Sequence, residues 1–279
     1  MIQHFVLTRF NLRLWNRDKS GSSVRTRVWL DHRFSIFERY CLPSISGQTC
    51  KDFKWIVLFD SKTPDEYKTR IAGYQSVCPQ LIPVYVEPQN GRFFAQIFGE
   101  EVRRLMDPSK RVLTTYLDND DALANHFVED IQYRAEHLQD GTFITYTDGY
   151  QYYTDHNYVM KIHYPRNHFV SVVENNDRSH VRTIYGYGSH YYIVKIPGVR
   201  IDNIPNSRMW CEVIHERNMG NDASFIRSSM EKDIHLLQRE FSISETLQSS
   251  PLIYIVRFLP RYAKTFIRRA KNRLFGREW

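Results

Sequence analysis

The residues best suited to chemistry follow a short apolar run near the middle of the chain. Residues 112–117 (VLTTYL) are mostly β-branched or aromatic, a composition typical of a buried strand. The run ends in Asp118, Asn119, Asp120 and Asp121. Carboxylates this close repel one another unless a cation or hydrogen-bond donors compensate them. Hard oxygen ligands at this density suit Mg²⁺ or Mn²⁺, which keep part of their coordination shell for a phosphate.

The same residues also have a purely structural interpretation. An acid-rich turn can precede a helix, with Asp121 or Asn125 as the N-cap. The order of the surrounding elements helps to decide between the two interpretations.

Strands and helices are predicted to alternate ahead of the acidic residues. The hydrophobic patterns indicate strands at 5–7, 53–59 and 81–86, and helices at 29–44, 64–74 and 93–106. This alternation predicts a mostly parallel sheet with helices on both faces. The carboxyl ends of its strands then share one edge, where open α/β sheets bind ligands. The polar residues expected at that edge are Thr8, Arg9, Asn11, Asp60, Asp118 and Asp120.

Four segments carry a resemblance to a known family. They are HFVLTRFNLRLW from His4, FERYCLPSISGQTCKDFKWIVLFD from Phe37, TTYLDNDDAL from Thr114 and WCEVIHERNMGND from Trp210. With residues 118–120 in the place of a DXD motif, the chain resembles the GT-A fold of nucleotide-sugar glycosyltransferases. More narrowly, it resembles the bacterial putative rhamnosyltransferase family, over residues 3–224.

The resemblance implies a metal-dependent enzyme that moves a sugar from a nucleotide-sugar donor to a glycan or lipid-linked glycan acceptor. Synthesis of bacterial surface polysaccharide or lipopolysaccharide is the implied process. The implied cofactor is Mn²⁺ or Mg²⁺, for which a neutral imidazole is a suitable third ligand. The implied metal ligands are Asp118, Asp120 and His215. The implied nucleotide-sugar contacts are Thr8, Arg9, Asn11, Asp60, Arg92, Asp118 and Asn119.

The stereochemistry of the implied transfer stays open. If the anomeric centre is inverted, a carboxylate must take the proton of the acceptor hydroxyl. Glu174 and Asp177 are the candidates because they follow the predicted sheet. If the configuration is retained, no such base is needed.

Two other functional classes stay open. A nucleotidyltransferase shares the acidic strand, but it usually has a Gly-rich phosphate loop or a reactive lysine after the first strand. This chain has Thr-Arg-Phe-Asn there instead. A non-catalytic nucleotide-sugar-binding module would keep the fold without the chemistry. The presence of both Asp118 and Asp120 counts against that loss of activity.

The second half of the chain is predicted to form a smaller antiparallel region on the acceptor side. Strands are expected at 142–153, with a turn at Asp148-Gly149, and at 158–163 and 168–173. The tyrosine-rich residues 183–194 could stack on acceptor sugars, or could simply form sheet. We therefore expect a glycosyltransferase domain over 1–250, with a nucleotide-sugar half at 1–123 and an acceptor half at 124–250.

The last residues, 251–279, differ from the rest in charge. They hold eight basic residues and one acidic residue, which accounts for the whole formal charge of +7. Apolar residues recur every three or four positions, which predicts an amphipathic helix from about Arg261 to Leu274. Such a helix could lie on an anionic membrane or pack its apolar stripe on the domain. Nucleic acid is not expected as a partner, since the rest of the chain offers no basic pattern.

Composition favours a cytoplasmic protein, peripheral at the inner face of the membrane. No apolar run is long enough to predict a transmembrane helix, and no secretory signal is recognised. The four cysteines show neither close pairing nor metal-ligand spacing, so we expect them to be reduced.

Overall fold

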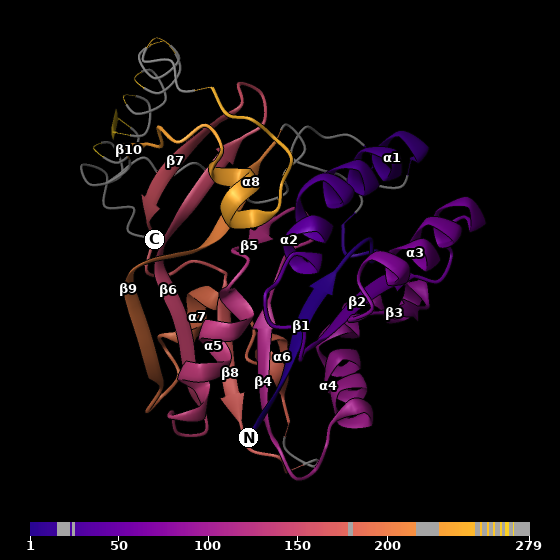
Figure 1. The fold of residues 1–279 in the computed structure, drawn as a ribbon. Helices are drawn as coiled ribbons and strands as arrows, with labels where there is room; N and C mark the ends of the chain where they lie inside the picture. Colours follow the sequence, from indigo (N-terminus) through magenta and orange to yellow (C-terminus); the bar gives the residue numbers. More distant parts are fainter. Residues whose placement is uncertain are drawn as a thin grey trace.

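The computed structural model describes residues 1–15, 23, 26–177, 181–215 and 229–248 (Figure 1). It also describes seven single residues of the C-terminal segment: Leu252, Val256, Leu259, Ala263, Phe266, Ile267 and Ala270. Within these described residues, ten strands join in one mixed sheet, whose main path runs β10-β7-β6-β8-β4-β1-β2-β3.

The N-terminal half has the predicted alternation of parallel strands and helices. Its strands are β1 (Ile2–Arg9), β2 (Lys54–Asp60), β3 (Leu81–Val86) and β4 (Arg111–Tyr116). Its helices are α1 (Arg27–Ile36), the π-helix η1 (Phe37–Cys41), α2 (Leu42–Ser46), α3 (Asp65–Val77), the 3-10 helix η2 (Pro88–Phe93) and α4 (Phe94–Leu105). The pairings β1–β2, β2–β3 and β1–β4 are all parallel. The expected α/β fold is confirmed.

Helices cover both faces of this parallel region, because successive residues of each strand enter different cores. Val6 and Val57 belong to the core under α1, α3 and α5 (Phe127–Glu136). Leu7 and Leu58, the next residues along, belong to the core under α4 and α6 (Thr183–Gly186). Burial of both faces explains the continuous apolar runs of β1 and β2.

The C-terminal half extends the sheet with mainly antiparallel strands. They are β5 (Ala122–Leu123), β6 (Thr142–Tyr153), β7 (Tyr158–His163), β8 (Val170–Glu174), β9 (Arg200–Ile214) and β10 (Ser229–Met230). The helices α7 (His190–Ile193) and α8 (Leu236–Phe241) complete it. β8 joins the two halves because it pairs antiparallel with both β4 and β6.

One local prediction for this half is wrong, and two alternatives that the sequence left open are not adopted. Asp148-Gly149 is not a turn but the middle of β6, where Gly149 is needed because a Cβ would come 2.1 Å from the Trp210 indole. Residues 183–194 form the short helices α6 and α7 rather than strands. Neither Asp121 nor Asn125 caps α5, since its N-cap is His126, and the amide of Val128 in its first turn donates to Gln48 Oε1 at 3.0 Å.

Most of the expected C-terminal amphipathic helix lies outside the described residues. The seven residues of the segment that are described are all exposed, including Leu252 at 67% and Phe266 at 65%. In the described part of the chain, no helix has the length and apolar character needed to cross a membrane.

Candidate active site

The acidic residues 118–121 form a turn directly after β4, beside the end of β1 (Figure 1). The strand order β3-β2-β1-β4 reverses its chain direction between β1 and β4, where α/β sheets open a crevice for ligands. The helical segment 27–46 supports this turn from one face. The Cys41 thiol donates to the carbonyl of Asp118 at 3.6 Å, and Ser44 Oγ accepts from the amide of Leu123 at 3.3 Å.

Asp118 is the most exposed carboxyl group of the turn, with 33% of its side chain accessible. The Tyr116 hydroxyl donates to its two oxygens at 2.9 and 3.0 Å. Arg9 Nη2 donates to the Tyr116 hydroxyl at 2.8 Å and lies 3.7 Å from Asp118 Oδ1. The Arg9 guanidinium also lies over the rings of Phe94 and Tyr185, at 4.7 and 5.1 Å. Arg9 and Asp118 are therefore brought together, as predicted.

Asn119 fastens the acidic turn to β1. Its amide nitrogen donates to the carbonyls of Arg9 and Phe10 at 2.9 and 2.6 Å. Its oxygen accepts a hydrogen bond from Arg33 Nη1 at 2.9 Å. Asn119 therefore stabilises the position of the acidic turn relative to β1.

Asp120 is buried between two cationic or ionisable partners. Arg33 Nη1 donates to Asp120 Oδ2 at 2.9 Å, and His215 Nε2 lies 3.0 Å from the same oxygen. Burial alone would raise the pKa of Asp120, but Arg33 and His215 outweigh it and hold this pKa well below its usual range. The predicted neighbours Asp120 and His215 thus do lie together.

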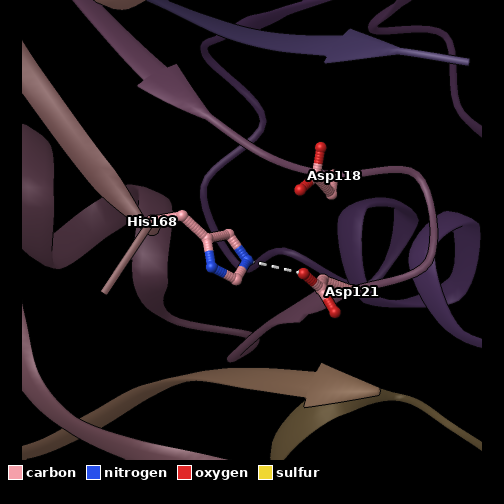
Figure 2. A group of neighbouring side chains, drawn as sticks. All are labelled: Asp118, Asp121 and His168. Carbon is pink, nitrogen blue, oxygen red and sulfur yellow. Dashed lines mark hydrogen bonds and ion pairs between the residues drawn. The ribbon is translucent and has the colours of Figure 1, made fainter. Parts of the chain in front are cut away.

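Asp121 is fully buried and paired with His168 (Figure 2). His168 Nε2 lies 2.7 Å from Asp121 Oδ2, and the amide of Val213 donates to Asp121 Oδ1 at 2.9 Å. Burial would lower the pKa of His168, but the hydrogen bond and charge of Asp121 raise it to about 9.

Asp118, Asp121 and His168 form a group that could hold a metal ion. One ligand atom from each lies within 4.8 Å of the others, and Figure 2 shows Asp118, in the turn after β4, and His168, just before β8, on either side of the space beside Asp121. Carboxylate oxygens and an imidazole nitrogen are ligands that Mn²⁺ accepts, so the donor set fits a divalent ion. This group shares Asp118 with the predicted set but contains Asp121 and His168 in place of Asp120 and His215.

Glu212 on β9 adds another carboxyl group to the site. Gln151 Nε2 donates to Glu212 Oε2 at 2.5 Å, and Gln151 Oε1 accepts from the Tyr153 hydroxyl at 3.0 Å. Burial raises the pKa of Glu212, and the charges of Asp118 and Asp120 act in the same direction. The backbone on either side of Glu212 meets the acidic turn, since Cys211 pairs with Ala122 and the amide of Val213 donates to Asp121 Oδ1.

The remaining residues predicted at this edge lie at the ends of β1, β2 and β3. Asn11 connects the end of β1 to the end of β2. Its side-chain nitrogen donates to Thr63 Oγ1 at 3.0 Å, and its side-chain oxygen accepts from the amide of Asp60 at 3.0 Å. Asp60 accepts a hydrogen bond from Arg13 Nε at 2.5 Å. Arg92 is exposed on η2, with its guanidinium over the Phe93 ring at 4.7 Å.

Thr8 is the exception among these residues. Its side chain is fully buried, and its hydroxyl accepts a hydrogen bond from Trp55 Nε1 at 2.9 Å. The structure therefore gives Thr8 a packing contact rather than a place on the open edge.

The structure does not bring Glu174 or Asp177 to the acidic turn, and this corrects their expected position. Glu174 pairs with Val112, at the opposite end of β4 from Asp118, which at about 3.3 Å per residue separates them by about 20 Å. The Glu174 carboxylate accepts hydrogen bonds from the backbone N–H groups of Arg182 and Thr183. Asp177 follows Asn176, whose amide donates to the carbonyl of Pro108 in the turn before β4. Neither carboxyl group can reach chemistry at the other edge.

Four residues of the site were not among the predicted metal ligands or nucleotide-sugar contacts, although weak signals existed for two. Asp121 directly follows the DXD-like triplet, and Arg33 is a charged residue on the apolar face of its helix, between Leu30 and Phe37. His168 and Glu212 carry no such signal, because only the pairing of distant strands brings them to the turn.

A family model described as "Putative rhamnosyl transferase" matches residues 18–226, which is well over half of the chain. A search of curated proteins found no match.

Among solved structures, similar folds occur at low sequence identity. A structure of S. aureus TarS 1–349 in complex with UDP is 9% identical, with a TM-score of 0.44, over 77% of this chain and 61% of that one. Another S. aureus TarS structure is 10% identical, with a TM-score of 0.41, over 76% and 36%. A putative nucleotide-diphospho-sugar transferase from Desulfovibrio desulfuricans G20 is 8% identical, with a TM-score of 0.36, over 76% and 80%. The chain thus spans less than two thirds of the TarS chains.

Proposed function

The chain belongs to the putative rhamnosyl transferase family, and from this premise we propose that it is a glycosyltransferase that uses a nucleotide-diphospho-sugar donor. The observation that carries the proposal is the cluster of Asp118, Asp120 and Asp121 with His168 and His215 at the carboxyl edge of the parallel strands. This is the edge at which sheets of this class bind ligands. The acceptor is proposed to be a glycan or a lipid-linked glycan.

We propose that the site holds Mn²⁺ or Mg²⁺ with Asp118 as a ligand. Asp121 and His168 are the nearest further donors, because one ligand atom of each lies within 4.8 Å of the Asp118 atom. When bound, a divalent ion would stabilise the negative charge of the departing diphosphate. Arg9, Asn11, Asp60 and Arg92 stay the proposed contacts of the nucleotide-sugar, because they flank the same edge.

In the proposed transfer, the acceptor hydroxyl oxygen bonds to the anomeric carbon as the bond from that carbon to the diphosphate breaks. The electron pair leaves with the nucleoside diphosphate, and the hydroxyl proton must go to a base if the configuration inverts. We propose Glu212 for this role, in place of Glu174 and Asp177. Its neighbours Cys211 and Val213 contact the acidic turn, and Gln151 holds one of its oxygens.

Contact with an anionic membrane through residues 251–279 is also proposed, consistent with a role in surface polysaccharide or lipopolysaccharide synthesis. The charge of the segment and the exposure of its described apolar residues support the proposal.

Scanning fluorimetry with a panel of nucleoside diphosphates, each with and without Mn²⁺, tests the donor and the metal together. One nucleotide is expected to raise the melting temperature substantially only when Mn²⁺ is present, since binding to the folded state stabilises it. That nucleotide identifies the base of the donor. Incubation of the matching nucleotide-sugar with an acceptor should then release the nucleoside diphosphate. Release of pyrophosphate would instead indicate a nucleotidyltransferase, and the absence of any stabilising nucleotide would contradict the proposal.

A further inference from the structure

The Arg33 guanidinium is held beneath the acidic turn by one of its nitrogens. Only 6% of the side chain is exposed. Nη1 makes both of its hydrogen bonds there, to Asn119 Oδ1 and Asp120 Oδ2, at 2.9 Å each. The Trp29 ring lies 5.3 Å from the guanidinium carbon. The group is therefore fixed in position before any ligand arrives.

The other edge of the same guanidinium is not used by the described part of the chain. Arg33 Nε is buried and has no hydrogen-bond partner there, and Nη2 accounts for none of the bonds that Arg33 makes. A buried N–H group without a partner is unfavourable, and native structures rarely leave one. The N–H groups of Nε and Nη2 point the same way, in the arrangement that binds two oxygens of one phosphate or carboxylate.

In Arg70 of the same protein, the edge formed by Nε and Nη2 is occupied by a carboxylate. Its Nε donates to Glu38 Oε1 at 3.0 Å, and its Nη2 donates to Glu38 Oε2 at 2.7 Å. Arg33 has no such carboxylate among the described residues, since its own partner Asp120 is bound through Nη1. An oxyanion from outside the chain would complete the pattern.

We propose that the Nε–Nη2 edge of Arg33 binds a phosphoryl group of the nucleoside diphosphate. The choice of a phosphate rests on the proposed function, which brings a diphosphate to this edge of the sheet. Asp120 and Asn119 orient the guanidinium from behind, and burial strengthens its charge-assisted hydrogen bonds. Arg33 would thereby stabilise the leaving group by contacts that need no metal.

The test is an NMR titration of the arginine Nε–H resonances in the full-length protein. Inorganic pyrophosphate is added without metal, and in a second series the nucleoside diphosphate that scanning fluorimetry selects is added together with Mg²⁺. The Arg33 resonance, assigned by its loss in Arg33→Lys, is expected to shift in both series. The Arg70 resonance is the internal control and should not move, because its edge is already filled. An Arg33 resonance that stays in place while the nucleotide binds would overturn the inference.

Binding measurements supply a second readout. Arg33→Lys keeps the positive charge but loses the two-pronged edge, so the affinity for the nucleoside diphosphate should fall about tenfold or more, with the nucleoside affinity unchanged. Arg70→Lys is the matched control and should leave both affinities unaltered. A malonate series distinguishes the two oxyanions: a shift by malonate that pyrophosphate cannot displace would overturn the assignment to phosphate. A diphosphate that shifts Arg33 without any sugar transfer would uphold the inference while refuting the proposed function.

Discussion

Each residue of the acidic turn has different partners, although the four are consecutive. Asp118 faces Tyr116 and Arg9, whereas Asn119 is bonded back to the end of β1. Asp120 meets Arg33 and His215, and Asp121 meets His168. Since the last two carboxyl groups are buried against cations or imidazoles, Asp118 is the one best placed to exchange ligands with solvent.

Asp118→Asn is therefore expected to separate metal binding from stability. Loss of the charge should weaken Mn²⁺-dependent nucleotide binding at least tenfold, because an amide is a poorer ligand for a hard cation. The free energy of unfolding should change by less than about 1 kcal/mol, since 33% of the side chain is exposed. Calorimetry of Mn²⁺ with nucleotide measures the first effect, and urea denaturation measures the second. Asp65→Asn, at a side chain that is 97% exposed, is the control. Unchanged Mn²⁺-nucleotide affinity in Asp118→Asn would remove Asp118 from the proposed metal site.

Glu212→Gln is expected to lower turnover by about 100- to 10,000-fold, the range associated with loss of a general base. Nucleotide affinity should be nearly unchanged, because the amide keeps the size of the carboxyl group. Glu174→Gln is the matched control, since Glu174 and Glu212 are each 6% exposed but lie at opposite edges of the sheet. Initial rates with a saturating donor measure the effect. Equal losses in the two variants, or a product with retained configuration, would argue against Glu212 as the base.

The site residues that could be predicted from the sequence are those that follow the carboxyl end of a parallel strand. Arg9 and Asp118 could be predicted, because the carboxyl ends of parallel strands share an edge. The His168–Asp121 pair could not, since the two residues are 47 positions apart and meet only after β8 pairs with β4. Glu174 was misplaced for a related reason. Its strand is antiparallel to β4, which carries its end to the far edge.

Some helices and strands are determined by the local sequence and could be predicted, whereas others are determined by tertiary packing and could not. β1 and β2 were predictable, because strands buried on both faces carry apolar runs such as FVL and WIVLF. The continuity of β6 through Asp148 and Gly149 was not, since a local turn signal is overridden by pairing with β7 and β9 on either side. Likewise, Tyr185 of α6 packs inward as part of a helix, stacked on Phe98 at 4.8 Å between ring centroids.

β1 also carries a titratable group in the core, which predicts acid sensitivity. His4 is 2% exposed, with Nε2 2.7 Å from Thr115 Oγ1, and burial lowers the pKa of His4 to about 3. The unfolded chain, with a pKa near 6.5, binds a proton that the folded chain does not. Stability is therefore fully present above about pH 6.5 and is lost as the pH falls towards 3.

Between pH 7.5 and 5.0, His4 should account for a loss of about 2 kcal/mol, at 1.36 kcal/mol for each pKa unit. His4→Gln cannot titrate, so its loss over this interval should be smaller by about that amount. Urea denaturation at the two pH values measures the difference. His137→Gln, at an exposed position, is the control. Equal pH dependence in the wild type and in His4→Gln would show that His4 is not held neutral.

For the molecule as a whole, charge and catalytic chemistry are separated along the chain. Residues 1–250 carry equal numbers of basic and acidic residues, and 251–279 carry the whole +7. The described residues of that segment expose apolar side chains such as Val256, Leu259 and Ile267. Positive charge beside exposed apolar surface is typical of segments that lie on anionic membranes.

Truncation after Ser250 is expected to leave the fold and nucleotide binding intact but to abolish sedimentation with anionic liposomes. Each basic residue near such a surface contributes about 1 kcal/mol, so even half of the eight give useful binding that salt weakens. A full-length variant with Phe266→Ser and Ile267→Ser keeps the charge and removes two exposed apolar groups. It should bind more weakly than the wild type and lose its binding at lower salt, because charge alone is screened. Equal liposome binding by the full-length and truncated proteins at low salt would refute membrane contact through this segment. Unfolding of the truncated protein would show instead that the segment packs on the domain.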